Sequence, residues 1–219
     1  MPAAAACPPP PPPPLALPGL AGLADALERA LARRTPRAEP RPGRRAAVLA
    51  VLYEQDGAPH LLLTKRADDL PSHPGQISLP GGVIEADDPS PRDAALRETE
   101  EEVGIPRAAL RVIGELDDVH TMASNFIIRP FVAVLAAPMA AVPSDREVAR
   151  ILHVPVADLL AADAALPPDP APLELRYPLA GEDVWGATAR ILRILSRVAR
   201  CALSPAAPEG GSEGASPGR

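Results

Sequence analysis

The spacing of apolar residues predicts an amphipathic helix near each end of the folded part of this chain. Across residues 20–34 leucines recur every three or four positions, which places them on one side of a helix opposite polar residues. The same spacing recurs across residues 186–203, where the apolar side carries Ile191, Leu195 and Val198. We expect the first helix to pack on the domain or on a partner, and the second to close the domain.

Between these helices the apolar runs are short and rich in branched residues, which favours strands. Residues 143–160 combine a strand with a short helix, and residues 173–186 indicate a hairpin. Another hairpin is expected around Gly57. The remaining predicted strands are 46–55, 58–67, 76–82, 111–120 and 126–137. Strands outnumber helices, so the expected fold class is α+β with a mixed β-sheet.

Composition divides the chain into one domain and two tails. Residues 1–19 contain a long run of prolines, and residues 204–219 are rich in glycine, serine and proline, so both are expected to be disordered. Residues 20–45 hold the first helix and a turn-rich linker. The single globular domain is therefore expected over residues 46–203.

The overall charge argues against polyanionic and membrane partners. The net charge of −6 leaves no basic surplus of the kind that nucleic acids or anionic membranes require. No apolar run approaches the roughly 20 residues that span a bilayer. The two cysteines, Cys7 and Cys201, provide neither a disulfide framework nor a cysteine-based zinc site. We expect a cytoplasmic protein that acts on a small molecule, and the sequence leaves a homodimer open.

Residues 90–105 have the features of a short helix with marked ends. Ser90 is a favoured N-cap, Pro91 suits the first helical position, and Asp93 lies where a capping box needs an acid. Gly104 supplies a C-terminal stop. A helix over this segment follows from local residue preferences alone.

The same helix is expected to carry a cluster of carboxylates. At about 100° per residue, Glu98, Glu101 and Glu102 are expected on one side and the apolar positions on roughly the opposite side. Neighbouring like charges cost a few tenths of a kcal/mol each, so we expect a cation there. Oxygen ligands alone favour Mg²⁺ or Mn²⁺ over zinc. A simple solvated face is the alternative.

Gly81 and Gly82 end the predicted strand just before this helix. Two glycines allow the backbone to approach a phosphate or a metal ion closely, although a plain turn is the commoner use of such a pair.

Taken together, these residues resemble the Nudix box, GX5EX7REUXEEXGU, where U is apolar. Three departures stand out: Asp88 replaces the first Glu, one extra residue precedes Arg97, and Thr99 occupies an apolar position. The matching positions are Gly82, Arg97, Glu98, Glu101, Glu102, Gly104 and Ile105.

The preceding segment, LLTKRADDLPSHPGQISLPGG, is similar to the signature LLTXR[SA]X3RX3GX3FPGG of the coenzyme A pyrophosphatase branch of that family. Pro71 stands in place of an Arg and Leu79 in place of a Phe. These two departures keep other substrates open, such as ADP-ribose, a dinucleotide or a nucleotide sugar. A non-catalytic Nudix module is disfavoured because all three glutamates of the box are present.

The resemblance implies a Nudix-type α/β/α sandwich and metal-dependent hydrolysis of coenzyme A to 3′,5′-ADP and 4′-phosphopantetheine. It implies that Glu98, Glu101 and Glu102 hold Mg²⁺ or Mn²⁺ and that Arg97 orients a glutamate through a salt bridge. These four residues form the expected catalytic set. For Asp88 the sequence leaves two roles open: a metal ligand or a loop cap.

The expected substrate-binding residues are Arg66, His73, Gln76, Gly81 and Gly82. Arg66 is a candidate for a substrate phosphate because guanidinium offers two parallel donors, with an ion pair to Asp68, Asp69 or Glu85 as the alternative. For the loop carrying His120, Ser124 and Asn125 we favour a bracing role, and for Tyr177 and Trp185 a place in the core.

Overall fold

The computed structural model describes residues 17–70, 73–135, 141–144, 147–168, 170–171 and 174–204. The predicted disorder of residues 1–16 and 205–219, and the departure at Pro71, lie outside these residues.

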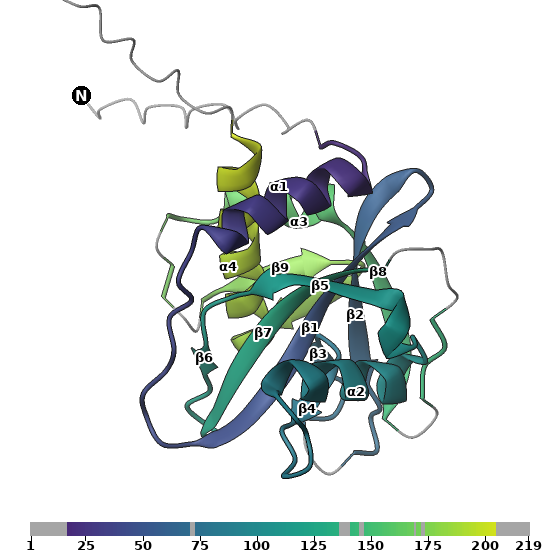
Figure 1. The fold of residues 1–219 in the computed structure, drawn as a ribbon, viewed down its shortest axis with the longest axis vertical. Helices are drawn as coiled ribbons and strands as arrows, with labels where there is room; N and C mark the ends of the chain where they lie inside the picture. Colours follow the sequence, from purple (N-terminus) through teal and green to yellow (C-terminus); the bar gives the residue numbers. More distant parts are fainter. Residues whose placement is uncertain are drawn as a thin grey trace, which may run out of the picture.

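Strand β1 (Arg44–Gln55) is the centre of a mixed sheet that has eight strands within the described residues (Figure 1). It pairs antiparallel with β2 (Ala58–Arg66) and parallel with β7 (Phe126–Leu135). The other strands are β3 (Ile77–Ser78), β4 (Gly81–Val83), β5 (Leu110–Glu115), β6 (Val119–His120) and β8 (Val148–Pro155). A separate hairpin joins β9 (Arg176–Leu179) to β10 (Glu182–Trp185).

Helices cover both faces of this sheet, which confirms the expected α+β class and α/β/α sandwich (Figure 1). Alternate residues of β1 serve the two cores: Leu52 faces the helices α1, α3 and α4, whereas Leu49 faces α2. The bounds are Leu20–Ala32 for α1, Pro91–Val103 for α2, Val156–Ala165 for α3 and Gly186–Leu203 for α4. A single 3₁₀ turn, η1, covers Arg107–Ala109.

Helix α1 packs on the domain itself. Leu23, Leu27 and Leu31 are buried in the core that also contains Leu195 of α4, so the expected apolar stripes of the two terminal helices meet. None of the described helices combines the length and the apolarity that a membrane crossing needs.

The segment 76–82 was expected to be one strand and is instead divided into β3 and β4. Strands β1 and β2 pair only near their hairpin, from Leu52 opposite Leu61 onward. In the opening between them, β3 pairs with β2 and β4 pairs with β1, so the chain crosses from one strand to the other at Pro80. The Pro80 carbonyl accepts the Leu49 N–H at 2.8 Å. The opening places Gly81 and Gly82 next to β1, in the middle of the sheet.

Three other expectations need smaller changes. The predicted strand over 111–120 is broken between β5 and β6. The strand at 126–137 is described only as far as Leu135. The short helix expected near residue 156 extends to Ala165, and Asp163 in the added part is buried and bonded to Tyr177 and Arg193.

Candidate active site between the glycine strand and helix α2

Strand β4, the glycine strand, contains Gly81 and Gly82 and lies against the carboxylates of α2. A methyl group at Gly82 would lie 2.5 Å from the carboxyl carbon of Glu98, which is closer than real contacts allow. The Gly81 N–H donates to the Glu102 carboxylate at 3.2 Å. Glycine is therefore required at position 82 to let Glu98 reach the strand. The close approach of a phosphate or metal ion to this pair stays a prediction.

Local signals set the ends of α2 as the sequence predicts. The Ser90 hydroxyl accepts the Asp93 N–H at 3.2 Å, and Pro91 is the first helical residue. Gly104 ends the helix with a φ of 68°, in the left-handed region. These ends fix which residues of α2 face the glycine strand.

The three glutamates of the box do not share one exposed face, which corrects the expectation. Glu102 is only 6% exposed and lies on the packed side of α2 with Thr99 and Val103. At 100° per residue Glu102 is only 60° from Thr99 around the helix. It therefore lies at the edge of the packed side, and the expectation of an exposed position was wrong. Glu98 is half-buried beside Gly82, and Glu101 is exposed.

Burial raises the pKa of both carboxyls that face the glycines. The pKa of Glu102 rises to about 8, because burial outweighs the hydrogen bond from Gly81, and the charge of Glu98 adds to the rise. Burial also raises the pKa of Glu98 despite its contact with Arg97. Because burial is the main cause of both shifts, a positive ion placed beside the two carboxyls would favour their charged forms.

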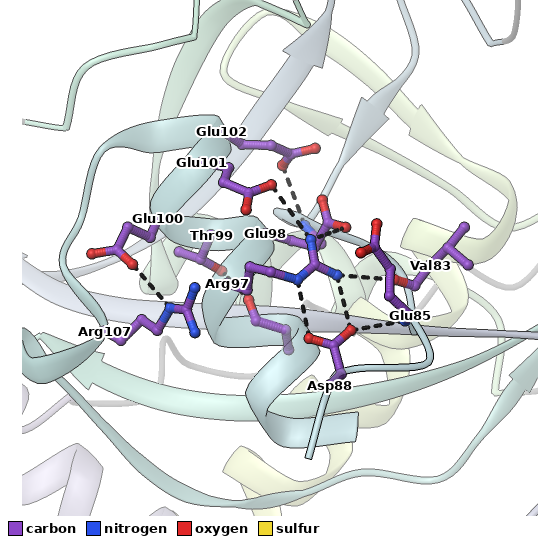
Figure 2. A network of polar contacts seen from close by, with 12 residues as sticks. Val83, Glu85, Asp88, Arg97, Glu98, Thr99, Glu100, Glu101, Glu102 and Arg107 are labelled. Atoms are coloured by element: carbon purple, nitrogen blue, oxygen red, sulfur yellow. Dashed lines mark hydrogen bonds and ion pairs between the residues drawn. The ribbon is translucent and has the colours of Figure 1, made fainter. Parts of the chain in front are cut away.

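Arg97 lies at the centre of the polar network that Figure 2 shows. It forms a two-point ion pair with Asp88, with Nε to Oδ1 and Nη2 to Oδ2 each at 3.0 Å. Its Nη1 donates to Glu98 at 2.8 Å and, more weakly, to Glu101 at 3.4 Å. The salt bridge expected between Arg97 and a glutamate is therefore present.

Asp88 braces the loop before α2. Besides holding Arg97, it accepts the Glu85 N–H at 2.8 Å, and Arg97 also donates to the Val83 carbonyl at 3.2 Å (Figure 2). Asp88, which replaces the first Glu of the box, thus connects the loop before α2 to Arg97 of α2, and Arg97 connects both to the glycine strand.

Arg66 has none of the ion pairs considered for it among the described residues. Its backbone N–H donates to the Gln76 carbonyl at 3.0 Å, while its side-chain Nε is buried without a partner within the described chain. Its charge lowers the pKa of Glu102, so the guanidinium lies near that carboxylate. Gln76 is partly buried and His73 is exposed, with a left-handed φ of 55°.

Glu147 is a further acidic residue of the site that the sequence did not reveal. Its charge contributes to the raised pKa values of Glu98 and Glu102, and its carbonyl accepts the Ala67 N–H at 3.0 Å. The Ser144 N–H in the same segment donates to the Glu102 carbonyl at 2.8 Å. No sequence signal marks Glu147, because only the fold brings it to α2.

The aromatic residues divide between the core and the surface. Tyr177 is fully buried and donates to Asp163 at 2.7 Å, as a core role predicts. Trp185 is 46% exposed, so its expected core position is wrong; it ends β10, whose buried residue is Val184. His120 bonds Asn125 at 2.9 Å, which agrees with loop bracing.

Within the described residues, no three acidic, histidine or cysteine side chains converge closely enough to hold a metal ion by themselves. The donor set nevertheless fits a hard divalent ion: Glu98 and Glu102 offer carboxylate oxygens with raised pKa values beside a bare glycine backbone. Backbone, water or substrate oxygens would complete such a site.

An acidic helix held over a glycine strand inside an α/β/α sandwich defines a domain of the Nudix class, and comparison with known proteins agrees. The NUDIX domain family model matches residues 43–175, which is more than half of the chain. The chain belongs to the Nudix hydrolase family.

Relatives of similar length share this assignment. An uncharacterized Nudix hydrolase, NudL, from Enterobacter sp. (strain 638) is 36% identical over 165 residues, covering 70% of this chain and 81% of the relative. A NudL from Yersinia pestis (strain Pestoides F) is 36% identical over 159 residues, with 70% and 79% covered. The crystal structure of RenU, a Nudix hydrolase from M. smegmatis, superposes with a TM-score of 0.53 at 24% identity, covering 74% of this chain and 88% of that one.

Proposed function

We propose that this Nudix hydrolase cleaves the diphosphate bond of coenzyme A or its acyl derivatives, yielding 3′,5′-ADP and 4′-phosphopantetheine, with Mg²⁺ or Mn²⁺ as cofactor. The observation that carries the proposal is the contact of Glu98 and Glu102 with the glycine strand. It brings two carboxylates to the same strand, where a divalent ion held by both would meet a diphosphate. The signature similarity over residues 62–82 supports coenzyme A as the substrate.

Each residue of the site has a separate task in this proposal. Glu98 and Glu102 would hold the ion, with Glu101 as a further ligand. When bound, a divalent ion supplies positive charge against the diphosphate and activates an attacking water. Arg97 keeps Glu98 in position through the bond at 2.8 Å. Gly81 and Gly82, the expected substrate-binding glycines, bring the strand close to these carboxylates, because Gly82 leaves the space that Glu98 occupies and the Gly81 N–H holds Glu102.

Four more residues complete the site. Arg66, whose buried Nε lacks a partner among the described residues, would bind a phosphate oxygen of the diphosphate. Gln76 and His73, in the loop between β2 and β3, would line the substrate site. Glu147, whose side chain makes no hydrogen bond within the described chain, is available to accept a proton from the attacking water.

The departure at Leu79 does not argue against this substrate. Leu79 is 3% exposed and belongs to the core, so its side chain affects packing and not substrate contact.

Product analysis tests the proposal directly. Purified protein is incubated with coenzyme A and, separately, with ADP-ribose, each with Mg²⁺, Mn²⁺ or EDTA, and the products are identified by mass spectrometry. We expect 3′,5′-ADP and phosphopantetheine, formed only when metal is present. Cleavage of ADP-ribose alone would keep the reaction and change the substrate, and no cleavage of either would indicate a non-catalytic module.

A glutamine at position 102 tests the assignment of the site. Glu102→Gln removes one carboxylate from the pair and should lower kcat by more than about a hundredfold, because even the outer partners of metal ligands cost 10- to 100-fold. Glu100→Gln is the matched control, since Glu100 lies on the same helix but pairs with Arg107 at 2.9 Å. Equal kcat values for the two variants would contradict the assignment.

A further inference from the structure

Two partly buried arginines lack the carboxylate partner that the others have. A buried charge is costly unless it is paired. Within the described residues Arg66 and Arg190 have no carboxylate at ion-pair distance. The paired examples are Arg34 with Asp117, Arg97 with Asp88, Arg129 with Asp118, and Arg193 and Arg200 with Asp163.

Arg190 has no carboxylate in contact within the described chain, and the two charges that act on it, Arg41 and Glu39, are paired with each other at 2.8 Å. It belongs to the second turn of α4, and its Nη1 donates to the neutral carbonyl of His120 at 2.6 Å. Burial lowers its pKa, and the charge of Arg41 lowers it further against a smaller opposite effect of Glu39. The guanidinium stays charged at any physiological pH, and among the described residues its one hydrogen bond is to a neutral carbonyl, so its other N–H groups are available to an anion.

The residue next to Arg190 is also incompletely paired. His120 is 9% exposed; its Nε2 bonds Asn125, and its Nδ1 is buried with no partner among the described residues. In a fully satisfied structural corner this buried Nδ1 would have a partner.

The start of α4 is attached to the strand that leads to the glycines. The Thr188 hydroxyl donates to the Ile77 carbonyl at 2.9 Å, and the Arg66 N–H donates to the adjacent Gln76 carbonyl at 3.0 Å. These two bonds place the backbone of Arg66 and the start of α4, two residues before Arg190, beside consecutive residues of one segment. Ile77 precedes Gly81 by four residues, which is about 13 Å of extended chain at most.

We propose that Arg190 binds a second phosphate of the substrate, a monoester on its nucleotide part that is separate from the diphosphate held near Gly81 and Glu102. This assignment deepens the proposed function and rests on it. The substrate class is then a nucleoside diphosphate derivative that carries an additional phosphate on the ribose. Arginine suits this task because its planar fork matches two phosphate oxygens.

Binding of nucleotides to the full chain tests the assignment without turnover. The affinities of 3′,5′-ADP, 2′,5′-ADP and 5′-AMP are measured by calorimetry for the wild-type protein, Arg190→Gln and Arg197→Gln. The control, Arg197, lies on the same helix and also donates to a backbone carbonyl, that of Pro168 at 3.0 Å. Comparison of the two bisphosphates tells which ribose oxygen carries the phosphate.

We expect the wild-type protein to bind one bisphosphate at least about tenfold more tightly than AMP, which is the range of one charge-assisted hydrogen bond. Arg190→Gln should remove this preference and leave the affinity for AMP unchanged, whereas Arg197→Gln should keep it. Arg190→Lys should restore part of it.

Three results would overturn the assignment: no preference in the wild-type protein, a preference that survives Arg190→Gln, or an equal loss of affinity for all three nucleotides in Arg190→Gln. The last would indicate that Arg190 contacts the common 5′-phosphate or supports the fold. An Arg190-dependent preference without cleavage of coenzyme A would contradict only the proposed reaction. Cleavage of coenzyme A without the preference would contradict only the role of Arg190.

Discussion

Gly82 and Glu98 depend on each other at the scale of single residues. The carboxylate occupies the space that any side chain at position 82 would need, with 2.5 Å between the methyl position and the carboxyl carbon. The backbone of Gly82 is not in the left-handed region, so a substitution there tests space and not strain.

Gly82→Ala should therefore lower activity by displacing Glu98. We expect kcat to fall about tenfold or more while the melting temperature changes little, because a half-buried glutamate can move aside. In a Glu98→Gln background the same change should cost far less, and the double-mutant cycle measures this coupling. Gly19→Ala, with nothing within 4 Å of the added methyl, is the control. Independent effects of the two substitutions would exclude the coupling.

Glu102 should make the stability of the metal-free protein depend on pH. Its pKa in the folded protein is about 8, raised from its usual value near 4.5. The folded state then holds a proton that the unfolded chain releases. The contribution of this proton to the free energy of unfolding is complete below about pH 4.5 and is lost as the pH rises through about 8. The loss is on the order of a few kcal/mol.

Urea unfolding in EDTA between pH 5 and pH 8.5 measures this loss. Glu102→Gln should flatten the decline over this window because it cannot titrate, whereas Glu100→Gln should retain it. A decline of the same slope in Glu102→Gln would show that another group is responsible.

At the scale of elements, helix α1 stabilises the face of the sheet opposite α2. Leu27 is 1% exposed and packs in the core that contains the buried face of α4. Leu27→Ala should lower the free energy of unfolding by about 2–5 kcal/mol, the range for deleting a buried leucine side chain. Urea denaturation checks the value. Leu20→Ala, at the partly buried first turn, should cost clearly less; equal costs would mean that α1 is not docked as described.

The helices of this face are also joined by a buried polar cluster. Asp163 of α3 accepts from Tyr177 of β9 at 2.7 Å and from Arg193 of α4 at 3.0 Å. Arg193 in turn donates to the carbonyls of Pro167 and Pro168, each at 2.8 Å. Such a cluster fixes the relative position of the elements because each charge is fully paired. It joins α4 to α3 and β9, whereas the bond from Thr188 to Ile77 joins the start of α4 to β3.

At the scale of the whole molecule, binding of a divalent ion should stabilise the fold. At 100 times its dissociation constant a ligand of the folded state adds about 2.7 kcal/mol. For a domain of this size that corresponds to roughly 5–10 °C in melting temperature. We expect Mn²⁺ to produce this increase at pH 8 in the wild-type protein and in Glu100→Gln, but not in Glu98→Gln or Glu102→Gln. An unchanged increase in all four proteins would place the ion elsewhere.

The sequence by itself determined the features that depend on neighbours along the chain. The ends of α2 follow from Ser90, Pro91 and Gly104, because caps and stops act within one helical turn. The glutamates and the two glycines could be assigned to one site because they are close in sequence and match a motif. The apolar stripes of α1 and α4 were evident from periodicity.

Only the tertiary structure decided which of these groups are buried and what they meet. Glu102 is buried because β4 fills the opening between β1 and β2, a pairing that no local pattern encodes. Glu147 reaches α2 through the pairing of β8 with β2, which joins segments far apart in sequence. Local preferences fix an element, but the burial and the pKa of a side chain depend on the elements that pack against it.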